Sequence, residues 1–75
     1  MSPDKLVHMI NQIARFYARR TEAEAAADIS AHLRRFWDPR MRAAIIALVD
    51  GHGEGLAPAA RLAVQQLATE TTQSA

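Results

Sequence analysis

Alanine is the residue that most limits what this chain can fold into. Hydrophobic residues make up 49% of the 75 residues, but 16 of them are alanine. Alanine favours helix formation, yet it buries little apolar surface. A chain of this size buries only about 62% of its surface on folding, a thin margin for a lone domain. The sequence therefore predicts one small helical domain, part of whose stability comes from a partner.

The remaining composition excludes several classes of protein. Without cysteine the chain can form no disulfide, thiolate zinc site or iron–sulfur cluster, and it offers no cysteine nucleophile. The longest apolar run, residues 43–49, is too short for a bilayer span of about 20 residues. The N-terminus lacks the layout of a signal peptide, because Asp4 and Asn11 interrupt any apolar segment. We therefore expect a soluble, cytoplasmic protein that contacts no membrane.

The first half of the chain predicts two amphipathic helices. Ser2 is the expected N-cap of a helix that begins at Pro3 and runs to about Arg19, with Asn11 on its polar side. Thr21 and Glu24 have the spacing of a capping box, which begins a second helix. The apolar stripe of the first helix contains Leu6, Met9, Ile10, Ile13, Phe16 and Tyr17. The stripe of the second, which ends near Phe36, contains Ala25, Ala26, Ile29, Leu33 and Phe36.

The second half predicts two more helices and completes an all-α fold. Asp38 is the expected N-cap of a helix from Pro39 to about Asp50, and Gly51 is expected to end it in a left-handed conformation. A fourth helix begins at Pro58, and residues 69–75 are expected to fray. Its apolar face contains Leu56, Ala59, Ala60, Ala63 and Leu67. The prediction is a single domain over residues 1–75, a bundle of about four short helices with an ordered core from about 3 to 68.

The third predicted helix is apolar on almost every side. Ile46 points about 100° away from the stripe that faces the core, and Ala43 and Ala47 close the back. The stripe consists of Met41, Ile45, Leu48 and Val49. A four-helix domain covers a helix on only one or two sides. We therefore expect a partner to cover the remaining flank, and the isolated chain to self-associate or to be only marginally stable.

Nothing in the chain predicts a catalytic or metal site. No two of the three histidines are four residues apart, and no nucleophile motif or phosphate-binding glycine loop is present. Asp50, His52 and Glu54 share a glycine-rich loop, but a solvated loop explains them better than a metal site. His32 lies at the edge of the second stripe, as a half-buried structural histidine would. We expect no catalytic, cofactor-binding or metal-binding residues, and therefore no enzyme activity.

Aromatic and arginine side chains concentrate between residues 32 and 42. Tryptophan and arginine are the residue types that most often anchor protein interfaces. The predicted interface consists of Arg34, Arg35, Phe36, Trp37, Asp38, Arg40, Met41, Arg42 and Ile46. In one alternative Phe36 and Trp37 belong to the core and Asp38 forms a salt bridge with a neighbouring arginine. In another alternative the arginines bind the phosphates of a nucleic acid. The net charge of only +1 argues against this alternative.

The same segment carries a resemblance to a known family. His-Leu-Arg-Arg-Phe-Trp-Asp-Pro-Arg-Met-Arg at 32–42 closely resembles the signature of the delta subunit of NAD-dependent, molybdenum-containing formate dehydrogenases. The agreement extends to Leu6–Phe16 and to Gly55-Leu56-x-Pro58, and it covers roughly residues 4 to 68. The long run at 32–42 makes the resemblance specific, whereas Gly-x-Leu-x-Pro alone would be weak.

The resemblance implies an accessory subunit of a soluble cytoplasmic complex that oxidises formate to carbon dioxide and reduces NAD+. In that family the large alpha subunit carries a molybdenum cofactor and iron–sulfur clusters, and the beta and gamma subunits carry FMN, iron–sulfur clusters and the NAD site. The delta subunit carries no cofactor, and its role is taken to be assembly or stability. The alternative is an independent helical interaction module that binds nucleic acid or self-associates.

Overall fold

The computed structural model describes residues 2–51 and 55–73, with side chains up to Glu70. Its four α-helices are α1 (Pro3–Phe16), α2 (Glu22–Phe36), α3 (Pro39–Gly51) and α4 (Pro58–Gln73). No strand occurs within these ranges. The predicted all-α bundle of four short helices is confirmed.

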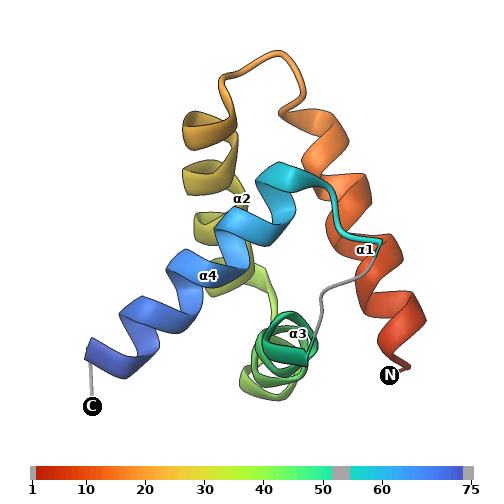
Figure 1. Cartoon of the computed structure of the whole chain (residues 1–75), viewed down its shortest axis with the longest axis vertical. Coiled ribbons are helices and arrows are strands. Elements are labelled where there is room, and N and C mark those ends of the chain that lie inside the picture. The colour runs from red at the N-terminus through yellow and green to blue at the C-terminus, as the bar shows by residue number, and fades with distance from the viewer. Residues whose placement is uncertain (1, 52–54, 74–75) are drawn as a thin grey trace.

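The two middle helices of the sequence do not form the main packing pair. α2 packs most extensively against α4, although the whole of α3 lies between them in sequence. In Figure 1, α1 and α2 form two arms joined at the top, α4 crosses the molecule diagonally, and α3 lies at the bottom. α3 packs against α4 and α1, so that one of its long sides has no helix of this chain against it.

Local capping chemistry begins three of the helices where the sequence predicts. The Ser2 hydroxyl accepts a hydrogen bond from the Lys5 amide at 3.3 Å. Thr21 and Glu24 form a complete capping box, in which each side chain accepts a hydrogen bond from the other residue's amide. The Asp38 carboxylate accepts a hydrogen bond from the Met41 amide at 2.9 Å.

Two helix ends differ from the prediction. α1 ends at Phe16 rather than Arg19, because the Tyr17 amide turns back to the carbonyl of Ala14 and a turn follows. Gly51 is the last residue of α3 and has no positive φ; among the described residues only Gly55 does, at 83°. α4 continues to Gln73, and the fraying of residues 69–75 stays a prediction.

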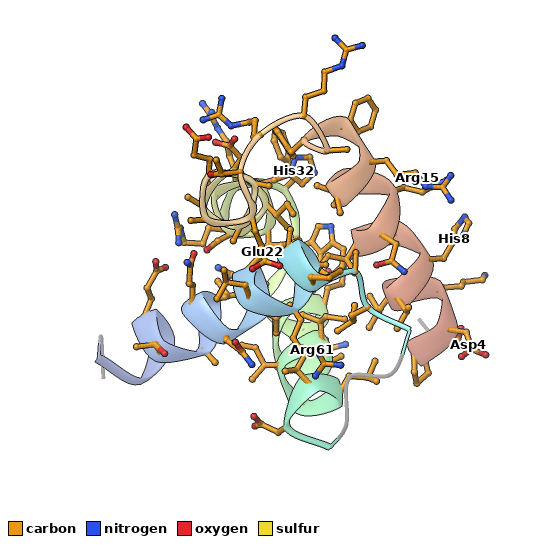
Figure 2. The ribbon with its side chains drawn as sticks, turned by 45° about the horizontal axis from the view of Figure 1, so that its top comes forward. Asp4, His8, Arg15, Glu22, His32 and Arg61 are labelled. Atoms are coloured by element: carbon orange, nitrogen blue, oxygen red, sulfur yellow. The ribbon has the colours of Figure 1, made fainter. Side chains whose placement is uncertain are left out.

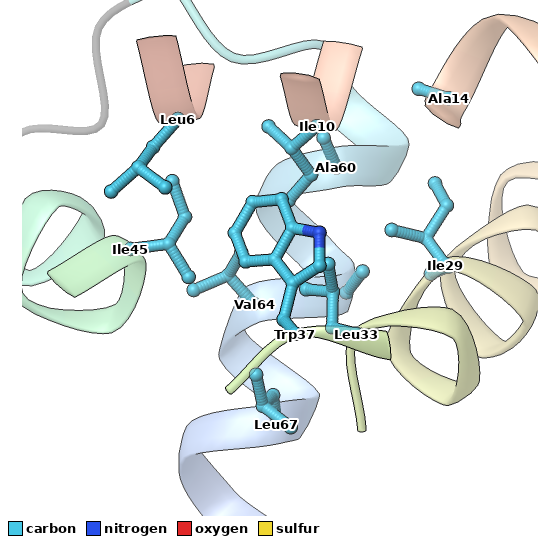
Figure 3. Close-up of a cluster of buried hydrophobic side chains, with 12 residues drawn as sticks. Leu6, Ile10, Ala14, Ile29, Leu33, Trp37, Ile45, Ala60, Val64 and Leu67 are labelled. Carbon is cyan, nitrogen blue, oxygen red and sulfur yellow. The ribbon is translucent and has the colours of Figure 1, made fainter. Parts of the chain in front are cut away.

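The core lies where α1, α2 and α4 meet the inner face of α3 (Figure 3). Four of its members are alanine, which allows the helix backbones to approach closely at those points. The fully packed set is Leu6, Ile10, Ala14, Ala26, Ile29, Leu33, Trp37, Ile45, Ala60, Ala63, Val64 and Leu67. The helical stripes predicted most of these residues.

Phe16 and Phe36 are the exceptions, because both were expected in apolar stripes and both are exposed, at 86% and 68%. Each is the last residue of its helix, where no facing element covers it. At the end of α2 the backbone becomes extended at Trp37, and this turns the indole into the core in place of the Phe36 ring.

Asn11 ties α1 to the segment that leads into α4. Its side-chain amide donates a hydrogen bond to the Gly55 carbonyl at 2.7 Å, and its side-chain oxygen accepts one from the Ala57 amide at 2.9 Å. This contact joins residues more than 40 positions apart, and it accounts for a polar residue that the helical pattern assigned only to a solvated side.

Candidate interaction surface

Eight of the nine predicted interface residues occupy the last turn of α2, the junction and the start of α3, which we call the α2–α3 corner (residues 34–42), and the ninth, Ile46, lies further along α3. Arg34, Arg35, Phe36, Asp38 and Arg40 are exposed. Met41 and Arg42 are half-buried. The corner therefore offers a surface in which arginine predominates.

Trp37 does not belong to that surface. Only 5% of the residue is exposed, and its ring lies in the core with Ile10, Leu33 and Val64 around it (Figure 3). The core alternative thus describes Trp37, whereas Phe36 is exposed. A partner reaches Trp37 directly only if the fold rearranges.

The Asp38 side chain also has a hydrogen-bond partner within the chain, but that partner is not an arginine. Its carboxylate caps α3 through the Met41 amide, and it forms no salt bridge with any described residue. The salt bridge suggested for Asp38 is therefore wrong. A carboxylate in the first turn already interacts favourably with the positive end of the helix dipole.

The four arginines of the corner differ in the hydrogen bonds and ion pairs that they form within the chain. Arg34 donates to the buried Ser30 hydroxyl at 2.9 Å and pairs with Glu70 of α4. Arg35, Arg40 and Arg42 form no ion pair with any described residue. Moreover, the Nε of Arg42 is buried without a hydrogen-bond partner, a state that is uncommon in folded proteins.

The outer side of α3 forms an open groove of about 450 Å³, which we call the α3 face. Ile45 is the only fully buried residue of this helix, and Ile46 is half-buried while Ala43 and Ala47 are exposed. The residues lining the face are Pro39, Arg42, Ala43, Ile46, Ala47 and Asp50. The described part of the chain leaves uncovered the flank that the all-round apolar pattern predicted to need a partner.

Two further features contribute to the exposed apolar surface. The His32 ring lies against Phe36 with centroids 4.7 Å apart, and His32 is half-buried as predicted. At the end of α1, Phe16 lines a second open hollow with Gln12 and Arg15. The helical periodicity of the sequence predicted Phe16 in the core, so this hollow was not expected.

Within the described residues, no three histidine, aspartate or glutamate side chains come together to hold a metal ion. The loop with Asp50, His52 and Glu54, which was expected to be solvated rather than metal-binding, lies mostly outside the described residues, so that expectation stays a prediction. Asp4 and His8 project from the same side of α1, one turn apart, whereas Glu22 lies away from them at the start of α2 (Figure 2). In the described part of the chain no helix is both long and apolar enough to span a membrane.

The comparison with known families decides the identity of the chain. Residues 5–64 match the model of the family described as "NADH-dependant formate dehydrogenase delta subunit FdsD". The chain belongs to this family. No curated protein and no solved structure gave a significant match. The part that matches the delta-subunit family runs from α1 into α4 and contains the whole α2–α3 corner and the α3 face.

Proposed function

We propose that this chain is a non-catalytic accessory subunit of a cytoplasmic NAD-dependent formate dehydrogenase, in which it supports assembly or stability of the complex. The match of residues 5–64 to the delta-subunit family carries this proposal. Its main partner is the large molybdenum-carrying alpha subunit, in a complex with the beta and gamma subunits. Those subunits hold the molybdenum cofactor, iron–sulfur clusters, FMN and the NAD site, and we expect the delta subunit to hold none.

Exposed apolar and arginine side chains support a role in binding another protein. Phe16 and Phe36 are exposed at the ends of α1 and α2, and Ala43 and Ala47 are exposed on the outer side of α3. Aromatic and arginine side chains are enriched in protein interfaces. The α3 face and the exposed arginines of the α2–α3 corner are surfaces that a second protein can cover.

Co-expression tests the proposal. The alpha, beta and gamma subunits are produced with and without this chain, the complex is purified through a tag on alpha, and formate-dependent NAD+ reduction is followed after heating. We expect the chain to co-purify at fixed stoichiometry, and the complex without it to give a lower yield or to lose activity at a lower temperature.

Two results contradict the proposal. One is a chain that stays in the unbound fraction while the complex forms and survives heating equally well without it. The other is a monodisperse chain that binds DNA in a salt-sensitive manner and ignores the enzyme subunits, which would favour the independent module.

A further inference from the structure

We propose that the α3 face is the docking site for an amphipathic helix of the large subunit that carries a carboxylate opposite Arg42. This inference rests on the proposed function and adds to it the surface that is used and the chemistry of the segment that covers it.

The spacing along α3 favours a helix as the occupant. The lining residues recur every three or four positions from Pro39 to Asp50, so they form a straight strip about 16 Å long at 1.5 Å per residue. Ala43 and Ala47 lie on either side of Ile46, and their small side chains leave a depression that a facing helix can fill. Amphipathic helices bind such grooves through apolar residues spaced by three, four and seven.

The charges on and beside the strip favour an acidic occupant. Arg42 lines the groove and forms no ion pair with any described residue, so a carboxylate that enters the groove can pair with the part of its guanidinium that faces the groove. Arg35 and Arg40 add two more positive charges without an ion pair among the described residues. Asp50 is the one carboxylate that lines the groove, and it lies at the opposite end from Pro39. An acidic residue near Arg42 and a basic one near Asp50 would set the direction of the docked helix.

A second copy of this chain fits less well. An antiparallel copy would pair Arg42 of each chain with Asp50 of the other, but it would leave Arg35 and Arg40 of both copies without an acidic partner, because Asp50 is the one carboxylate that lines the groove. One helix face also supplies less than the roughly 800 Å² per partner of a stable interface. A larger subunit can extend beyond the α3 face onto the α2–α3 corner, and acidic residues on it would meet both requirements.

Titrating the purified alpha–beta–gamma complex with fluorescently labelled delta variants tests the docking site. Ala47→Glu places a charge in the groove at an exposed position without disturbing the core, and Arg42→Glu reverses the charge expected to meet the carboxylate. We expect each to weaken binding by about 30-fold or more, the effect of losing one hot-spot contact. Arg42→Lys should weaken binding less than Arg42→Glu.

Arg19→Glu is the matched control, because it makes the same charge change at an exposed position in the turn after α1. It should bind as the unaltered chain does, and all variants should keep their helical circular dichroism. If the unaltered chain fails to bind, the proposed function falls. If it binds and Ala47→Glu and Arg42→Glu bind equally well, the docking site is wrong while the proposed function stands. If these variants abolish only self-association, the occupant is a second copy and the inference is overturned.

Discussion

At the scale of single residues, Phe36 and Trp37 are neighbours in sequence with opposite environments. Trp37 is 5% exposed and Phe36 is 68% exposed. Truncating a buried tryptophan to alanine costs about 3–5 kcal/mol, which rivals a small domain's whole stability of about 5 kcal/mol. Trp37→Ala should therefore keep only about 0–2 kcal/mol of stability and lose up to about half of its helical circular dichroism at 25 °C, whereas Phe36→Ala should lose about 0.5 kcal/mol or less. A folded Trp37→Ala that no longer joins the complex would instead restore the interface role predicted for this side chain.

Asn11 allows a second test at this scale. Asn11→Ala removes two hydrogen bonds and leaves the half-buried Ala57 amide without its partner. We expect a loss of about 1–3 kcal/mol in the free energy of unfolding, which lowers Tm by about 4–8 °C per kcal/mol in a domain of this size. Gln12→Ala, at the exposed neighbouring position, should leave Tm nearly unchanged. Equal Tm values for the two variants would show that the amide contact does not hold the segment in solution.

At the scale of helices, the start of α2 should make stability depend on pH. Hydrogen bonds from the Thr21 amide and hydroxyl lower the pKa of the Glu24 carboxyl, with help from the Arg20 guanidinium. Because the folded pKa lies below the unfolded value, the carboxylate stabilises the fold above about pH 4.5, and this contribution is lost as the pH falls through the folded pKa. The Tm of Glu24→Gln should therefore fall less than that of the unaltered chain between pH 6 and pH 3. Parallel Tm curves would show that Glu24 does not contribute.

The helices also show which features a sequence of this kind predicts. Helix starts follow from side chains within three residues of the first turn, and Ser2, Thr21 and Asp38 cap as expected. Helix ends and the burial of terminal residues depend on what packs nearby, so periodicity alone misplaced Phe16. Trp37 lies outside any helix, where a periodicity of 3.6 residues does not apply.

The sequence likewise predicted one part of the candidate surface and not another. The uncovered flank of α3 was predicted because this helix is apolar on almost every side, and the three other short helices cannot cover all of its sides. The sequence did not predict which arginines form an ion pair within the chain, because Arg34 pairs with a residue 36 positions away in α4. The lining of the groove by Asp50 and the partnerless Nε of Arg42 likewise required the three-dimensional arrangement.

At the scale of the whole molecule, burial is distributed unevenly and stability should follow it. α2 contributes five buried residues to the fold and packs along α4, whereas α3 contributes only Ile45. Segments with few buried apolar contacts open at the lowest free-energy cost. In the free chain we therefore expect the amides of α3 to exchange with solvent fastest among the four helices, at least about tenfold faster than those of α2, which corresponds to about 1.4 kcal/mol.

Docking should slow amide exchange most in α3, the helix expected to exchange fastest in the free chain. Hydrogen exchange measured by mass spectrometry can follow this change in the full chain. When the partner complex is added, protection should rise most in α3 and least in the interior of α2, because α2 is already closed against α4. Equal protection of α2 and α3 in the free chain would show that the bundle opens as one unit. A rise confined to the end of α1, around Phe16, would move the binding surface to the other exposed apolar hollow.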